Sequence, residues 1–280
     1  MQQTAPARLP SSESRPAARA GRGVYPTCGP RLAAAALALC AALTACTTTP
    51  VTGRSAFNLI PVEQDRDLGA QAYADMLGGA PVADQHPQAP QVRQVVDRLV
   101  AVAQSDVPVP FDWEVHVIDD PAMVNAWCLP GGKMAVYTGI LPVTKTPAGL
   151  AVVMGHEIAH AVARHGSERM SQQLGLEAVL AYAAGDYAAL AGQVAALGVL
   201  LPWGRKQELE ADEIGLVYMA RAGYDPREAV EFWKRMEALG GQEPPEWLST
   251  HPSHSHRIEE LQAQMPRALQ EYEASKGRAP

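Results

Sequence analysis

The chain has 280 residues, of which 47% are hydrophobic and 6% aromatic, enough for one large domain or two small ones. The first 45 residues hold five arginines and one glutamate, so the remaining 235 carry 18 basic and 29 acidic residues, a net charge of −11. This acidity argues against a nucleic-acid-binding protein and against electrostatic binding to an anionic membrane surface.

The N-terminal 45 residues have the layout of a bacterial signal peptide of the lipoprotein type. A polar leader ends at Arg31, an apolar run covers residues 32–45, and Cys46 follows directly. We therefore expect residues 1–45 to be removed and Cys46 to be lipidated, with residues 46–60 as a polar tether. Thr47 is not the aspartate typical of inner-membrane retention. The sequence thus predicts a periplasmic protein, lipid-anchored to a membrane, with the outer membrane favoured.

The sequence after the tether predicts mostly helices with one short strand region. Helical spacing of apolar residues, capping signals and Gly/Pro turns give the boundaries. The predicted helices cover residues 62–78, 91–104, 146–170, 206–222, 225–239 and a last one ending near Tyr272. The predicted strands cover residues 113–118 and 133–141, the second belonging to a hairpin. We expect an α+β fold, mostly α, in a single domain over residues 61–272, with residues 273–280 as a flexible tail.

The segment HEIAH within the predicted helix 146–170 carries the strongest chemical signal. His156 and His160 are four residues apart, so both imidazoles face one side of the helix and can reach one ion. Glu157 is adjacent, where a carboxylate can accept a proton from water activated by a metal. The spacing therefore indicates a catalytic metal site rather than a structural histidine pair.

The next histidine along the chain does not fit as a third ligand. His165 is nine residues past His156, about half a turn around a continuous helix, so we expect it to face away at the surface. The longer metzincin motif also fails, because the sequence has Ala163 and Gly166 where that motif needs glycine and histidine.

An acidic pair further along the chain supplies better candidates. Glu208 and Asp212 are four residues apart on one face of a predicted helix, whereas Glu210 points away from both. One of the pair could bind the metal while the other supports a ligand histidine. The uncharged stretch over residues 187–204 approaches the length of a membrane span, but a single crossing would separate Glu208 from His160. We therefore expect this stretch to turn back or to pack in the core.

Three motifs in order resemble a known family: HEIAH, then RKQELEADEIGL over residues 205–216, then STHPSHSHRI over residues 249–258. Together they resemble the HtpX-like and CAAX-prenyl-protease-type-I zinc metallopeptidases, a gluzincin group. The similarity covers roughly residues 47–262 and looks like the periplasmic lipoprotein branch related to the mitochondrial Oma-type protease. It implies a gluzincin-type domain with a small antiparallel sheet beside the HExxH helix.

The resemblance also implies roles for individual residues. One Zn²⁺ per chain would be bound by His156, His160 and Glu208, with Glu157 as the general base and Asp212 as the supporting acid. His251 matches a late histidine near the active site, which would either steady the oxyanion or occupy the open zinc position in a resting form. The residues expected to contact substrate border the cleft: Asn125, Ala126, Gly131 and Gly132.

These expectations combine into a zinc endopeptidase that degrades misfolded or misassembled periplasmic and outer-membrane proteins. The strand Lys133–Thr138 would present an edge to which the substrate backbone pairs. The alternative is a zinc-stabilised lipoprotein that acts as a chaperone or assembly factor with little proteolysis. A structural site has no use for Glu157, so the intact motif favours the enzyme.

Overall fold

The structure, a computed structural model, describes residues 46–107, 109–184, 204–239, 245–251 and 256–277. The predicted signal peptide and the apolar stretch up to residue 203 lie outside these ranges. The helical elements are α2 (Val62–Leu77), α3 (Ala89–Ala103), η1 (Gln104–Asp106), η2 (Thr138–Ile140), α4 (Leu141–Thr144), α5 (Pro147–Val162), α6 (His165–Ala184), α8 (Arg205–Arg221), α9 (Glu228–Leu239), α10 (Glu246–Thr250) and α11 (Arg257–Lys276). The strands are β1 (Cys46–Thr48), β2 (Ser55–Phe57), β3 (Glu114–Ile118), β4 (Ala126–Leu129) and β5 (Lys133–Tyr137).

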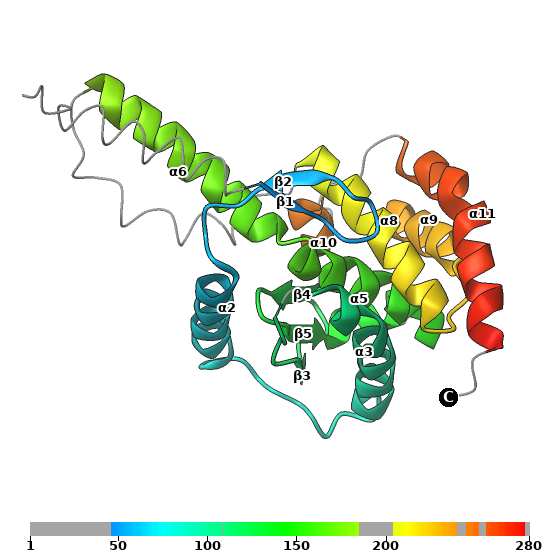
Figure 1. The fold of residues 1–280 in the computed structure, drawn as a ribbon. Helices are drawn as coiled ribbons and strands as arrows, with labels where there is room; N and C mark the ends of the chain where they lie inside the picture. Colours follow the sequence, from blue (N-terminus) through cyan, green and yellow to red (C-terminus); the bar gives the residue numbers. More distant parts are fainter. Residues whose placement is uncertain (1–45, 108, 185–203, 240–244, 252–255, 278–280) are drawn as a thin grey trace, which may run out of the picture. The chain divides into compact units, whose positions relative to one another are not determined.

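Helix α5 is the central element of the fold and carries the HEIAH motif. It begins as predicted, with Pro147 in its first turn and the Thr146 hydroxyl accepting a hydrogen bond from the Gly149 amide at 3.0 Å. Every residue from Gly149 to Val162 is buried, so the metal-binding motif lies in the core. Helices α8 and α3 and strand β4 pack around α5 (Figure 1).

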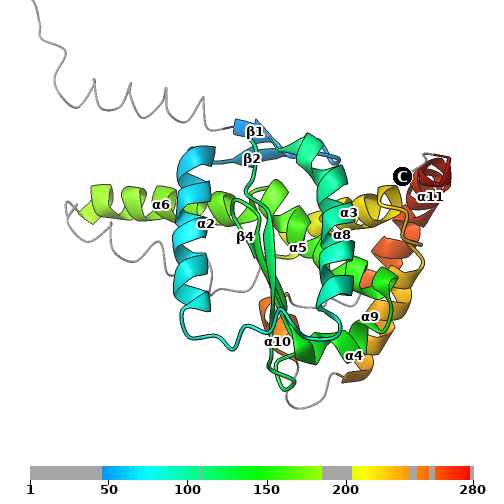
Figure 2. The same cartoon turned by 90° about the horizontal axis from the view of Figure 1, so that it is seen from below.

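The three-stranded sheet has the order β3-β5-β4. Strands β4 and β5 form the predicted antiparallel hairpin, with Ala126 opposite Val136, and β3 adds to β5 in parallel. Helix α2 lies against β4 and β5 and helix α3 against β3, on either side of the strands in Figure 2. The predicted fold class, mostly helical with a small sheet beside the HExxH helix, is confirmed.

One detail of the predicted sheet is wrong. Strand β5 is hydrogen-bonded on both sides, so it has no free edge to offer a substrate. The strand at the edge beside α5 is β4, which has β5 as its one neighbour in this sheet.

The predicted continuous helix over residues 146–170 is also wrong, because α5 ends at Val162. Arg164 adopts a left-handed conformation with φ of 56°, which breaks the helix before α6 begins. Its guanidinium bonds to the Asp65 carboxylate at 3.1 Å and to the Ile60 carbonyl at 2.6 Å. These long-range contacts stabilise a backbone conformation that the local sequence does not predict.

The segment predicted as a polar tether instead forms an ordered hairpin, β1–β2, with Cys46 opposite Phe57. Its turn lies against α8, and β2 lies against α6 (Figure 1). Thr49 and Ala56 are buried there.

At the other end of the chain, α11 continues to Lys276, beyond the predicted end near Tyr272. Among the described helices, none combines the length and apolarity needed to cross a bilayer.

Candidate metal centre

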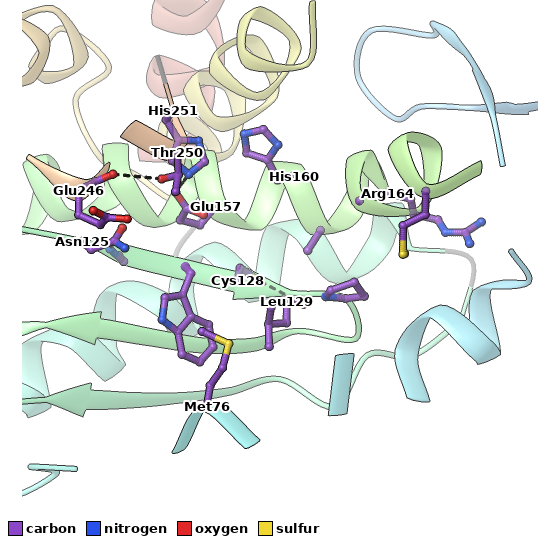
Figure 3. Close-up of a pocket in the computed structure, with 16 residues that line it drawn as sticks. Met76, Asn125, Cys128, Leu129, Glu157, His160, Arg164, Glu246, Thr250 and His251 are labelled. Carbon is purple, nitrogen blue, oxygen red and sulfur yellow. Dashed lines mark hydrogen bonds and ion pairs between the residues drawn. The ribbon is translucent and has the colours of Figure 1, made fainter. Parts of the chain in front are cut away.

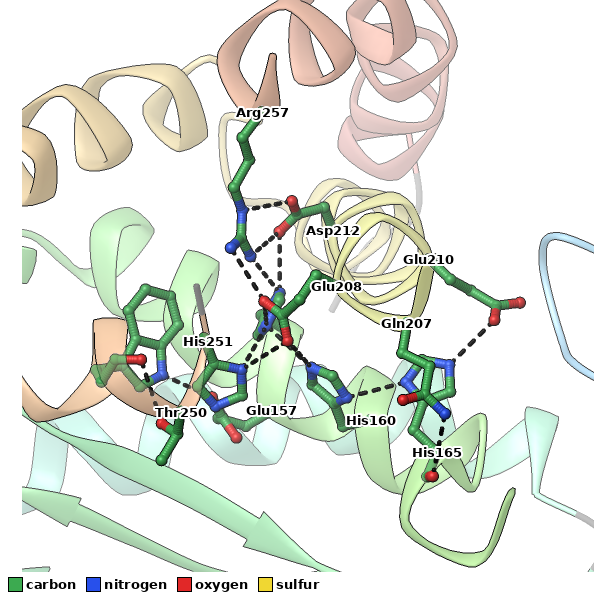
Figure 4. Close-up of polar contacts among 12 residues, drawn as sticks. Glu157, His160, His165, Gln207, Glu208, Glu210, Asp212, Thr250, His251 and Arg257 are labelled. Atoms are coloured by element: carbon green, nitrogen blue, oxygen red, sulfur yellow. Dashed lines mark hydrogen bonds and ion pairs between the residues drawn. The ribbon is translucent and has the colours of Figure 1, made fainter. Parts of the chain in front are cut away.

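Four buried side chains converge at the middle of α5. His156 and His160 come from α5, Glu208 from the first turn of α8, and His251 from the residue after α10. Each offers one ligand atom, and these atoms all lie within 4.8 Å of one another. The two Nε2 atoms are 3.1 Å apart, and the Glu208 carboxylate oxygens lie 3.5 Å from His156 Nε2 and 3.3 Å from His160 Nε2 (Figure 4).

The orientation of the two α5 histidines fits a metal ion. Both Nε2 atoms point inward, toward each other and Glu208, while both Nδ1 atoms are engaged outward. His156 Nδ1 lies 2.9 Å from an Asp212 oxygen, and His160 Nδ1 lies 2.9 Å from His165. Two imidazole nitrogens and one carboxylate are the donor set of a catalytic zinc site, with its fourth position left for water or substrate.

Asp212 occupies the place expected for a carboxylate that supports a ligand without binding the metal. Besides His156 Nδ1, it accepts a hydrogen bond at 2.8 Å from Arg257. The same guanidinium donates to Glu208 at 3.0 Å, so one arginine bridges both acids of α8. Arg257 is fully buried and lies over the Trp233 ring at 3.5 Å. Sequence reasoning missed Arg257, although it is the next-to-last residue of the STHPSHSHRI motif.

The electrostatics of the cluster follow from burial and from the charged groups around it. Burial lowers the pKa of His160 well below its ordinary value, which keeps the imidazole in the neutral form that binds metals. Burial opposes ionisation of Glu208, but His156 and the hydrogen bonds from its histidine neighbours hold its pKa well below the usual range. Burial likewise disfavours the Asp212 anion, but Arg257 and His156 outweigh it and lower the pKa of that carboxyl.

His165 is not the surface histidine that the sequence predicts. Because the helix breaks at Arg164, its side chain turns back into the core and is fully buried. His165 Nδ1 lies 2.9 Å from His160 Nδ1, and Nε2 lies 3.0 Å from a Glu210 oxygen (Figure 4). Glu210 does point away from Glu208, as expected, yet it too is buried.

The proposed base, Glu157, is held from two sides. Its Oε1 accepts a hydrogen bond from Trp247 Nε1 at 2.8 Å and lies 3.3 Å from His251 Nε2. The other nitrogen of His251 lies 3.1 Å from Glu208. Trp247 is fully buried on α10, a short helix that the sequence analysis did not predict, and no local pattern signalled its role.

A cleft opens beside the cluster (Figure 3). Glu157, His160 and His251 line one wall, and strand β4 with Met76 and Met170 supplies mostly apolar surface. Asn125 and Ala126 line the cleft, as the sequence analysis expects.

The other two residues expected to contact substrate lie elsewhere. Gly131 and Gly132 form the turn between β4 and β5, with positive φ angles of 84° and 89°. Added Cβ atoms there would meet Arg66 and Trp113, at 2.6 and 2.5 Å. These glycines shape the hairpin and do not line the cleft.

Cys46 is exposed at the start of β1, and its lipidation stays a prediction.

The chain is similar to known metallopeptidases over most of its length. The model of "Peptidase family M48" matches residues 86–265. Mitochondrial metalloendopeptidase OMA1 of Schizosaccharomyces pombe is 38% identical over 81% of this chain and 68% of its own length. The human mitochondrial metalloendopeptidase OMA1 is 35% identical over 79% of this chain and 46% of its own length. The beta-barrel assembly-enhancing protease of Escherichia coli is 27% identical over 75% of this chain and 46% of its own length.

These relatives correct the predicted localisation. Relatives at 34–38% identity across most of the chain, from fission yeast, budding yeast and human, are named as mitochondrial enzymes. The prediction of a periplasmic protein that is lipid-anchored to a membrane, with the outer membrane favoured, is therefore wrong. It relied on the layout of residues 1–45, which lies outside the described structure and outside the matched family region.

Proposed function

The chain belongs to peptidase family M48 and is a zinc metalloendopeptidase, and from this premise we propose that it cleaves unfolded or misassembled proteins, bound as extended segments along β4. The observation that carries the proposal is the position of Glu157: its carboxylate lines a largely apolar cleft that has an edge strand for a wall. Such a cleft recognises backbone and apolar side chains, which folded proteins conceal.

The reaction follows from the placement of the acid and base groups. His156, His160 and Glu208 would hold the zinc ion, which would supply the Lewis acid for activating water and polarising the substrate carbonyl. The Glu157 carboxylate accepts the proton that the attacking water releases. It then gives this proton to the nitrogen of the leaving amine. Trp247 keeps Oε1 of this carboxylate fixed between the two transfers.

Substrate binding is assigned to the outer edge of β4. An edge strand has a row of backbone groups that can pair with an added strand, and this pairing is independent of substrate sequence. Trp127 and Leu129 of β4, with Met76 and Met170, give the cleft its apolar surface. Extended segments with bulky apolar side chains would bury most surface there.

We assign His251 to a resting form of the site. Its Nδ1 atom lies 3.2 Å from His156 Nε2 and 3.1 Å from Glu208 Oε1, and its Nε2 atom lies 3.3 Å from Glu157 Oε1. A histidine in this place would occupy the position that water needs, so substrate binding must displace it. This arrangement favours the resting role over a role in steadying the oxyanion.

The substrate class is tested by comparing one protein in two states. The zinc-loaded chain is incubated with a disulfide-stabilised globular protein and with the same protein reduced and alkylated, and cleavage is followed by gel and mass spectrometry. We expect cleavage of the unfolded form at segments with apolar side chains. Equal cleavage of both forms would contradict the proposed selectivity, and zinc binding without cleavage of either would favour a zinc-stabilised chaperone.

A further inference from the structure

A line of buried polar groups leads from the metal cluster toward the N-terminal hairpin. His160 contacts His165 through the two Nδ1 atoms at 2.9 Å, and His165 Nε2 contacts Glu210 Oε2 at 3.0 Å. His160, His165 and Glu210 are all buried. The proposed reaction uses neither His165 nor Glu210.

The line continues from Glu210 into the N-terminal hairpin. The hydroxyls of Thr49 and Thr52 each donate to Glu210 Oε1 at 2.5 Å, and Arg54 Nε donates to Oε2 at 2.5 Å. The Arg54 guanidinium also donates to both oxygens of Glu168, at 2.6 and 2.8 Å. Glu210 is thus connected to the metal ligand His160 through His165, and it directly contacts three side chains of the β1–β2 turn.

The directions of these hydrogen bonds are mutually consistent. His160 can bind a metal through Nε2 only if its Nδ1 carries the proton, and this N–H then donates to His165 Nδ1. His165 must therefore carry its own proton on Nε2, which donates to Glu210. The Glu210 carboxylate accepts this bond and the bonds from the hairpin, as an ionised acid can.

We propose that His165 and Glu210 are positioning residues for the zinc ligand His160, and that the Thr49–Arg54 turn completes this support by orienting Glu210. The hairpin is then part of the metal site's outer support, and its docking is coupled to zinc affinity. Outer partners of metal-binding histidines fix the ring orientation and tautomer, and their loss typically weakens metal affinity by about 10- to 100-fold.

A purely structural polar cluster is the competing explanation. Loss of a buried hydrogen bond would then lower stability without a specific effect on zinc. The two explanations differ in metal affinity, which can be measured without any peptidase assay.

The test measures the affinity of the whole chain for Zn²⁺ alone, in competition with a chromophoric chelator. The variants are His165→Ala, His165→Gln, Glu210→Gln and the double change Thr49→Val with Thr52→Val. Tyr218→Phe is the control, because it removes a hydrogen bond from α8 to Asp106 that is not part of this line. Thermal unfolding of each metal-free variant gives its stability.

We expect His165→Ala to lose about 10- to 100-fold in zinc affinity and His165→Gln to recover part of it, since an amide can both accept and donate. Glu210→Gln and the double threonine variant should lose affinity by a smaller factor, and Tyr218→Phe should lose none. Affinities within twofold of wild type for His165→Ala and Glu210→Gln would overturn the proposal. If His165→Ala does not fold, Glu210→Gln and the double threonine variant decide by the same criterion.

The proposal also rests on His160 binding zinc, which a further variant tests separately. His160→Ala should abolish tight zinc binding. Wild-type affinity in His160→Ala would refute the ligand assignment itself, whereas loss in His160→Ala with no loss in the His165 and Glu210 variants refutes the positioning role alone.

Discussion

Gly155 on α5 and Gly215 on α8 face each other where the two ligand-bearing helices cross. A Cβ atom on Gly215 would lie 2.8 Å from the His156 backbone nitrogen, and one on Gly155 would lie 3.1 Å from the Gly215 carbonyl oxygen. Glycine at both positions lets the helix backbones approach closely enough for Glu208 to reach the two histidines. The contact therefore sets the geometry of the metal site from outside it.

Substituting Gly215→Ala should push α8 away from α5, because the added methyl meets backbone atoms that cannot rotate aside. We expect a loss of about 1–3 kcal/mol in unfolding free energy and weaker zinc binding, measured by denaturant unfolding and chelator competition. Gly175→Ala on α6 is the matched control, since nothing lies within 4 Å of its added Cβ. An equally stable Gly215→Ala protein with unchanged zinc affinity would contradict this role of the contact.

Trp247→Phe keeps a buried aromatic ring on α10 but removes the hydrogen bond to Glu157. A hydrogen bond to a charged group contributes about 1.5–3 kcal/mol, so kcat should fall by roughly 10-fold or more. Zinc affinity should not change, because the lost hydrogen bond goes to Glu157 and not to a metal ligand. Steady-state kinetics on an unfolded protein substrate measure the effect, and a wild-type kcat would show that Glu157 needs no such support.

Arg257→Met should destabilise the protein strongly, since it leaves Glu208 and Asp212 buried without their arginine. Breaking a buried ion pair from one side costs about 3–5 kcal/mol. Arg267→Met, on the same helix, removes a largely exposed ion pair with Glu213 and should cost under about 1 kcal/mol. Chemical denaturation of the metal-free proteins compares the two, and similar losses would argue against the structural importance of Arg257.

The hydrogen bonds around Glu210 lead us to expect a specific dependence of stability on pH. Burial opposes ionisation of Glu210, but hydrogen bonds from His165, Thr49, Thr52 and Arg54 outweigh it and lower its pKa from 4.5 to about 2. A lowered acid pKa contributes stability that is fully present above pH 4.5 and is lost as the pH falls toward 2. In metal-free protein, the stability difference between wild type and Glu210→Gln should be largest near neutral pH and should shrink through this window. A difference independent of pH between 7 and 2.5 would contradict the assignment.

The sequence predicts the parts of the fold that depend on local chemistry. Thr146 and Pro147 mark the start of α5 correctly, because capping and an N-terminal proline act within one turn. The spacing of His156 and His160, and of Glu208 and Asp212, shows which side chains share a face whatever the helix packs against. These two pairs meet in the structure.

The sequence does not reveal features that depend on tertiary contacts. The break at Arg164 is stabilised by Asp65 and Ile60, 99 and 104 residues earlier, and it moves His165 from the expected surface into the core. The glycine at position 149 has a local cause instead, because a Cβ atom there would lie 2.0 Å from the Thr144 carbonyl oxygen. The central position of β5 likewise depends on the parallel pairing with β3, which no local pattern specifies.

The most direct test of the central claim is the peptidase activity of Glu157→Gln with its zinc content measured on the same preparation. The account predicts wild-type zinc content, because Glu157 is outside the ligand group, and a fall in kcat of about 10²- to 10⁴-fold, because the base is gone. Unchanged proteolysis by a fully zinc-loaded Glu157→Gln protein would contradict the account.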